Sequence, residues 1–166
     1  MRIYLLGAGL IVLAMWGYMY SRRLSDGAIA DFYVLDAKST VDLDAEASCA
    51  LVADDFHGTS ISTIRGEAVK QSLDKAKFCE DMHRAVAILR QAAQAAHTAP
   101  NVSYSNQQNR VIFAPDHRAA TIDVTYQLDI GRMHVSGQRT DKLIKRDGKV
   151  LLLEQDDRSD VSLVMR

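Results

Sequence analysis

The chain has 166 residues and a formal net charge of −1, and 25% of its residues are charged while 48% are hydrophobic. These values are typical of a single globular domain and exclude an intrinsically disordered chain. Basic and acidic residues are balanced and no Lys/Arg-rich run occurs, so nothing indicates nucleic-acid binding. With only two cysteines, the chain is no disulfide-dense miniature scaffold.

The amino terminus carries an apolar segment. Residues 3–20 contain no charged side chain and are bracketed by Arg2 and by Arg22-Arg23, and a helix of this length would span about 27 Å. We predict that residues 1–23 form an uncleaved transmembrane signal anchor in a bacterial inner membrane. The alternatives are a cleaved signal peptide, for which no A-x-A-like site is present, and a buried soluble helix.

The flanking arginines do not decide the orientation of this anchor. A lone pair of cysteines favours an oxidising compartment, so we expect the soluble domain in the periplasm.

Two short helices are predicted next. Ser25 is a suitable N-cap, and apolar residues then recur at helical intervals through about residue 38: Ile29, Phe32, Tyr33 and Leu35. A second start signal at Asp42 opens a helix that should end near Asp54-Asp55. Residues 56–63, rich in Thr, Ser and Ile, predict a short strand.

Residues 67–96 contain neither Pro nor Gly, and apolar side chains recur every three or four positions. This pattern predicts the longest helix of the chain, within which Asp74 could cap a new start. Pro100 follows its end, because the residue before a proline avoids the helical region.

Beyond Pro100 the apolar period changes to two, which predicts antiparallel strands over 102–107, 109–114, 120–130, 133–146 and 149–154. Asp147-Gly148 is a type I′ hairpin signal. In the strand 120–130 the apolar residues occupy the even positions, and Thr121, Asp123, Thr125, Gln127 and Asp129 lie between them. Side chains alternate faces along a strand, so the even positions form one inward wall that carries no carboxylate.

The order of these elements, and three short motifs, resemble the nuclear transport factor 2-like superfamily, also described as SnoaL-type or cystatin-like. The motifs are Asp42-Leu43-Asp44-Ala45, Ala53-Asp54-Asp55-Phe56 and Ile64-Arg65-Gly66-Glu67-Ala68-Val69. The resemblance implies an α+β cone in which three helices pack on a curved antiparallel sheet over residues 24–155, with residues 156–166 as a C-terminal tail. In that superfamily the concave face of the sheet encloses a pocket.

A pocket of this kind would be lined by Tyr33, Tyr104, Ile122, Val124 and Tyr126, and it would suit a small apolar ligand. Asp54, Asp55 and His57 form an alternative acid–base cluster, although exposed aspartates at a helix end need no partner. The sequence contains no histidine pair with metal-ligand spacing, so we expect no metal and no cofactor.

Cys49 and Cys79 lie on helices that are expected to pack together. In an exported domain they could form a disulfide, and otherwise they would be ordinary buried thiols.

Three functions follow from these expectations. The first is a membrane-tethered, non-enzymatic binding or assembly module of the bacterial cell envelope, which acts on a protein partner or self-associates, with the Thr-rich face of the strand 120–130 as a possible homodimer interface. The second is an isomerase, dehydratase or lyase, and the third is a carrier of a lipid or small ligand. A filled cone would favour the first, an open apolar cavity the third, and a cavity holding an Asp or His hydrogen-bonded to a second polar group the second.

Overall fold

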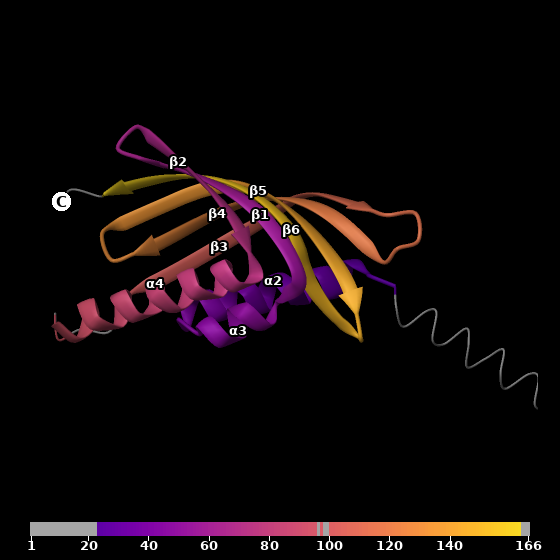
Figure 1. Cartoon of the computed structure of the whole chain (residues 1–166), viewed down its shortest axis with the longest axis horizontal. Coiled ribbons are helices and arrows are strands. Elements are labelled where there is room, and N and C mark those ends of the chain that lie inside the picture. The colour runs from indigo at the N-terminus through magenta and orange to yellow at the C-terminus, as the bar shows by residue number, and fades with distance from the viewer. Residues whose placement is uncertain (1–22, 96, 98–99, 164–166) are drawn as a thin grey trace, which may run out of the picture.

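The computed structural model describes residues 23–95, 97 and 100–163. Helices α2 (Asp26–Val41), α3 (Ala45–Ala50) and α4 (Lys75–Ala95) pack on one face of a single six-stranded sheet. Figure 1 shows the three helices together beneath the curved sheet. The α+β architecture, with helices packed on a curved sheet, is therefore confirmed.

The strands of the sheet are β1 (Val52–Ile64), β2 (Glu67–Asp74), β3 (Val102–Phe113), β4 (Ala119–Ile130), β5 (Met133–Arg146) and β6 (Lys149–Leu163). Their spatial order is β2-β1-β6-β5-β4-β3. Every neighbouring pair is antiparallel except β1 and β6, which run parallel. The expectation of a purely antiparallel sheet was wrong for this one pair. After β5 the chain forms β6, which lies beside β1 and runs in the same direction.

The long helix predicted over residues 67–96 is two elements. Residues 67–74 form β2, and only α4 is helical. The reason is the turn at Arg65-Gly66, where both residues have positive φ angles of 55° and 86° and Ile64 pairs with Glu67. A two-residue turn of this kind closes a β-hairpin. Asp74 then accepts a hydrogen bond from the backbone N–H of Lys77 at the start of α4.

Other boundaries also differ from the prediction. The second helix is confined to Ala45–Ala50, and residues 52–55 already belong to β1. The predicted strands 102–107 and 109–114 are one strand, β3, with a register shift between Gln108 and Arg110. Strand β6 continues to Leu163, so residues 156–163 belong to the domain and are no separate tail.

The hydrophobic core lies between α2 and the middle of the sheet. Ile29, Phe32 and Tyr33 of α2 pack against Ile122 and Val124 of β4, among other residues. Ser25 caps α2 as predicted, since its side chain accepts a hydrogen bond from the Ala28 N–H. At the far end of β5, Asp147 and Gly148 have positive φ angles of 49° and 78° and close the expected hairpin.

No helix within the described part of the chain has the length and apolar character that a membrane crossing requires. The segment predicted as an anchor, residues 3–20, lies outside the described residues.

Candidate functional site

A cavity of about 320 Å³ lies between the helices and the concave face of the sheet. This size is within the usual range for small-molecule sites. Most of its wall is apolar: Phe32, Leu43, Leu51, Phe78, Met82, Val86, Leu89, Val102, Leu128, Ile130 and Leu152 are among the lining residues. Ala85 of α4 lines the cavity and is also exposed to solvent.

The even-numbered side chains of β4 point toward the helices, as predicted. Ile122 and Val124 are fully buried in the core, while Tyr126, Leu128 and Ile130 line the cavity further along the same face. Asp123 points to the opposite side, where it forms an ion pair with Arg110 at 2.7 Å. The inward wall of β4 therefore carries no carboxylate, but β5 and β6 carry Asp141 and Asp157 on the same side of the sheet.

The register of β5 against β4 brings charge into the interior. Arg139 lies opposite Val124, and Asp141 lies opposite Ile122. Directly paired residues share a face of the sheet, so both charged side chains point toward the helices. Asp141 is completely buried and Arg139 lines the cavity.

A β-bulge determines which side chains of β6 point toward the helices. Leu143 pairs with Leu152 but Lys142 pairs with Glu154, so Leu153 is an additional residue in the strand. A bulge of one residue reverses which side chains point inward beyond it. As a result Asp157 lies opposite Arg139 and lines the cavity, whereas Asp156 is exposed.

Arg139 is held by two carboxylates and two aromatic rings. Its Nη2 donates a hydrogen bond to Asp36 Oδ2 at 2.7 Å, and its Nε lies 3.0 Å from Asp141 Oδ2. This Nε contact forms an ion pair but lacks the geometry of a hydrogen bond. The guanidinium carbon lies 5.7 Å from the ring centroids of both Tyr33 and Tyr126, a distance at which cation–π attraction is expected.

Asp141 is the deepest charged group in this network. It accepts hydrogen bonds from the Tyr33 hydroxyl at 2.9 Å and from Gln155 Nε2 at 3.2 Å. Burial raises the pKa of its carboxyl group, although Arg139 and these donors oppose the shift. Because it does not line the cavity, Asp141 orients Arg139 and has no access to a ligand.

Asp157 is a cavity carboxylate without an ion pair among the described residues. The Tyr126 hydroxyl donates to its Oδ1 at 2.8 Å, and Ser60 Oγ lies 3.3 Å from its Oδ2. Burial raises the pKa of the Asp157 carboxyl, and the hydrogen bond from Tyr126 and the charge of Arg139 oppose this only in part. A partly buried carboxylate of raised basicity is suited to accept a proton.

Of the five residues predicted to line a pocket, Tyr104 and Tyr126 do so. Tyr33, Ile122 and Val124 lie beneath the cavity in the core. Tyr33 takes part indirectly through Asp141.

The alternative cluster of Asp54, Asp55 and His57 lies away from the cavity. All three are exposed residues of β1, and each pairs with a different partner: Lys75 at 2.7 Å, Arg146 at 2.6 Å and Glu154 at 3.7 Å, respectively. The expected helix-to-strand corner does not exist there, because β1 already begins at Val52. Asp54 and Asp55 form surface ion pairs, and His57 lies near Glu154 at the surface.

Sequence reasoning missed Asp36, Arg139, Asp141 and Asp157. Asp36 continues the inward stripe of α2, one helical turn after Phe32 and Tyr33, whereas Leu35, which was assigned to that stripe, is 53% exposed.

No cluster of three or more His, Cys, Asp or Glu side chains that could hold a metal ion occurs among the described residues.

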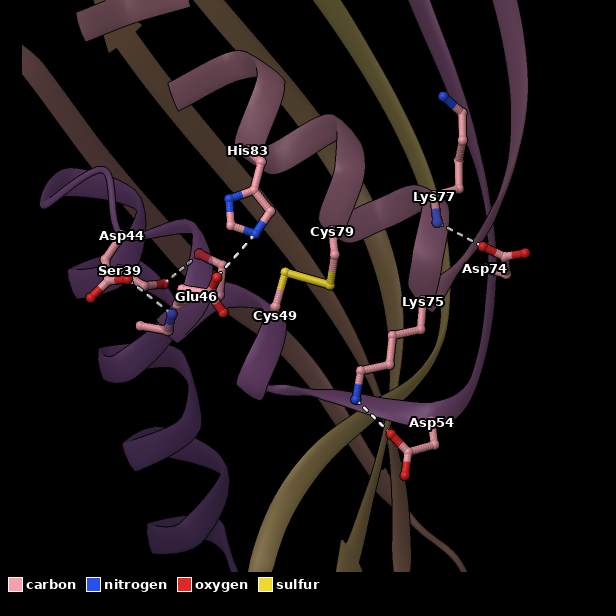
Figure 2. The surroundings of a disulfide bond; sticks show 12 residues. Ser39, Asp44, Glu46, Cys49, Asp54, Asp74, Lys75, Lys77, Cys79 and His83 are labelled. Carbon is pink, nitrogen blue, oxygen red and sulfur yellow. Dashed lines mark hydrogen bonds and ion pairs between the residues drawn. A yellow bond between two sulfur atoms is a disulfide. The ribbon is translucent and has the colours of Figure 1, made fainter. Parts of the chain in front are cut away.

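A disulfide joins Cys49 of α3 to Cys79 of α4, as Figure 2 shows. In the same view His83 of α4 points toward Glu46 of α3, and the distance from His83 Nε2 to Glu46 Oε1 is 3.4 Å. Both helices contribute to the cavity wall, α3 through Ser48 and α4 through Phe78 and others. The disulfide therefore fixes α4 beside the cavity.

No family model matches the sequence, and no curated protein sequence matches it either. Solved structures are similar in fold. A nuclear transport factor 2-like protein of unknown function from Pseudomonas putida has a TM-score of 0.59 at 12% identity and covers 80% of this chain and 84% of its own. A candidate scytalone dehydratase from Novosphingobium aromaticivorans has a TM-score of 0.58 at 14% identity, with coverage of 84% and 87%.

A hexachlorocyclohexane dehydrochlorinase is similar to the same extent, with a TM-score of 0.56, 12% identity and coverage of 84% of this chain and 88% of its own. Identities this low carry information about the fold alone. The described domain has the nuclear transport factor 2-like, cystatin-like fold.

Proposed function

We propose that this protein is an acid–base enzyme, an isomerase, dehydratase or lyase, that removes a proton from carbon next to the carbonyl group of a small apolar substrate. The observation that carries the proposal is the pairing of Asp157 with Arg139 across β6 and β5 in the wall of a mostly apolar cavity. Directly paired side chains lie about 5 Å apart at their Cβ atoms, so one small molecule can contact both groups.

The roles of the two side chains follow from their chemistry. The Asp157 carboxylate accepts the proton from carbon, and the raised pKa makes it a stronger base than an exposed aspartate. The electron pair left on carbon moves to the carbonyl oxygen, and the Arg139 guanidinium stabilises that oxyanion. Tyr126 holds the carboxylate through its hydrogen bond to Oδ1.

The outcome depends on the substrate. Return of the proton from Asp157 to a different carbon gives isomerisation. Alternatively the enolate electron pair forms a double bond to the β-carbon while the bond to a leaving group there breaks; hydroxide leaves as water with the proton from Asp157, which is dehydration, and another anion leaves in another elimination. The apolar wall excludes water from the enolate and favours a substrate that is hydrophobic apart from its carbonyl group.

The cavity also bears on the other two hypotheses. A non-enzymatic binding module was expected to have a filled cone, and a carrier an apolar cavity without chemistry. A cavity that holds Asp157 hydrogen-bonded to Tyr126 fits the enzyme best. The likeness in fold to a dehydrochlorinase and to a candidate dehydratase supports the same choice. The membrane anchor at residues 3–20, the periplasmic location, the protein partner and self-association remain predictions.

Hydrogen–deuterium exchange tests the proposal without knowledge of the natural substrate. Small cyclic ketones are incubated with the full-length protein in D₂O, and loss of the proton signal next to the carbonyl is followed by NMR. We expect exchange with the wild type and a decrease of about 10²-fold or more in Asp157→Asn. Asp156→Asn is the matched control, because Asp156 is the adjacent carboxylate on the exposed side of the strand.

Exchange at equal rates in Asp157→Asn and the wild type would refute the assigned base. Absence of exchange with every ketone that binds would refute the enzyme and leave the carrier.

A further inference from the structure

Arg139 is the one cationic side chain that lines the cavity among the described residues. A guanidinium at the end of an apolar cavity ordinarily recognises a carboxylate or phosphate, because its N–H groups match two oxygen atoms. Here that geometry is already occupied. Asp36 accepts a hydrogen bond from Nη2 at 2.7 Å, and Asp141 lies 3.0 Å from Nε.

The charges near the cavity do not favour a ligand that brings an additional negative charge. Asp36, Asp141 and Asp157 face a single guanidinium. Even if Asp141 and Asp157 were both protonated, Asp36 alone would balance Arg139. A carboxylate ligand would therefore lose its hydration on entering an apolar cavity and gain no net positive charge in return.

The energetic balance is different for an uncharged carbonyl group. A guanidinium has five N–H groups, and among the described residues only Asp36 accepts a hydrogen bond from Arg139. An additional N–H can therefore donate to a ligand oxygen without displacing Asp36. A neutral oxygen also costs less to desolvate than an ionised carboxylate.

We infer that the cavity selects uncharged carbonyl compounds over carboxylates of the same shape, and that Asp36 sets this selectivity by occupying Arg139. The inference deepens the proposed function and rests on it, because the same cavity would hold the substrate. It assigns Asp36 a role in specificity: the α2 carboxylate converts an anion-binding group into a donor for neutral oxygen.

Benzamide and benzoate are a suitable pair of probes, because they share ring, shape and carbonyl carbon but differ in charge. Their dissociation constants are measured by calorimetry at neutral pH on the full-length protein. We expect the wild type to bind benzamide at least about tenfold more tightly than benzoate. In Asp36→Asn the ratio should move toward benzoate by about tenfold or more, since Arg139 loses its hydrogen-bonded counter-charge.

Asp123→Asn is the matched control. Asp123 also pairs with an arginine, Arg110, but on the outer face of the sheet, so the ratio should not change. Asp157→Asn provides a second variant in case Asp36→Asn does not fold by circular dichroism. It removes one negative charge from the cavity wall and should move the ratio in the same direction.

Preferential binding of benzoate by the wild type would overturn the inference. An unchanged ratio in a folded Asp36→Asn would overturn it as well, as would failure of both probes to bind the wild type at millimolar concentration. The ratio is an equilibrium property and does not depend on turnover. A shift in Asp36→Asn without any hydrogen–deuterium exchange would therefore contradict only the proposed reaction, and exchange without the shift would contradict only the specificity of Asp36.

Discussion

Gly137 of β5 is paired with Tyr126 of β4. Its substitution tests whether Tyr126, through its hydrogen bond to Asp157, positions the candidate base. A Cβ atom at Gly137 would lie 2.7 Å from the Cζ and hydroxyl oxygen of Tyr126 and 2.7 Å from the backbone oxygen of Arg158. Ordinary contacts between such atoms begin above 3 Å. Because one of the obstructing atoms is backbone, rotation of the Tyr126 side chain cannot relieve the whole overlap.

Gly137→Ala should therefore lower the free energy of unfolding by about 1–3 kcal/mol, the usual cost of overpacking. It should also displace the Tyr126 hydroxyl from Asp157 and reduce the hydrogen–deuterium exchange rate of a bound ketone by about tenfold or more. Urea unfolding followed by circular dichroism measures the first effect and NMR the second. Gly27→Ala is the control, because nothing lies within 4 Å of the Cβ that it adds. Wild-type stability and wild-type exchange in Gly137→Ala would refute the assignment of Tyr126 as a positioning residue.

Three further predictions concern the domain as a whole. Replacing Cys49 and Cys79 by serine removes a link between residues 30 positions apart and should cost about 3–4 kcal/mol in urea unfolding; equal stability of oxidised and reduced wild type would contradict it. Gly148→Ala forces a side chain onto a φ of 78° and should cost about 1 kcal/mol. Burial raises the pKa of Asp157 in the folded state, so the folded protein binds the Asp157 proton more tightly than the unfolded chain does. The wild type should therefore lose stability relative to Asp157→Asn as the pH rises from the ordinary aspartate range through the raised pKa. A stability difference between these two proteins that does not change with pH would argue against that shift.

The sequence was most informative where one local pattern decides the structure. Strict alternation from Ala120 to Ile130 indicated the inward face of β4, and Asp147-Gly148 indicated the last hairpin. It was misleading at residues 67–74, where helical spacing of apolar residues competed with a hairpin turn at Arg65-Gly66. Pairing with β1 decided the outcome there, because secondary structure follows tertiary context when the local preference is weak.

Part of the candidate site could have been predicted. The two-residue turn after Ile130 fixes the register of β5, so counting forward along β5 from Met133 places Arg139 and Asp141 opposite inward residues of β4. The helical period likewise places Asp36 on the inward stripe of α2.

Asp157 could not have been placed in the same way. The turn at Asp147-Gly148 fixes the start of β6, and without the bulge at Leu153 simple alternation would put Asp156 inside and Asp157 outside. A bulge depends on the curvature of the whole sheet, which no short stretch of sequence encodes. The inward wall of β4 carries no carboxylate, as expected, and the carboxylates in or near the cavity come instead from α2, β5 and β6.

The pH dependence of hydrogen–deuterium exchange tests the assignment of Asp157 as the base most directly. A carboxylate accepts a proton only when it is ionised, so the exchange rate of a bound ketone should rise with pH to a plateau. Its midpoint should lie above the ordinary aspartate range, because burial raises the pKa of Asp157. The account predicts that this rise is present in the wild type and in Asp156→Asn and absent in Asp157→Asn. A rise of the same size and midpoint in Asp157→Asn would contradict it.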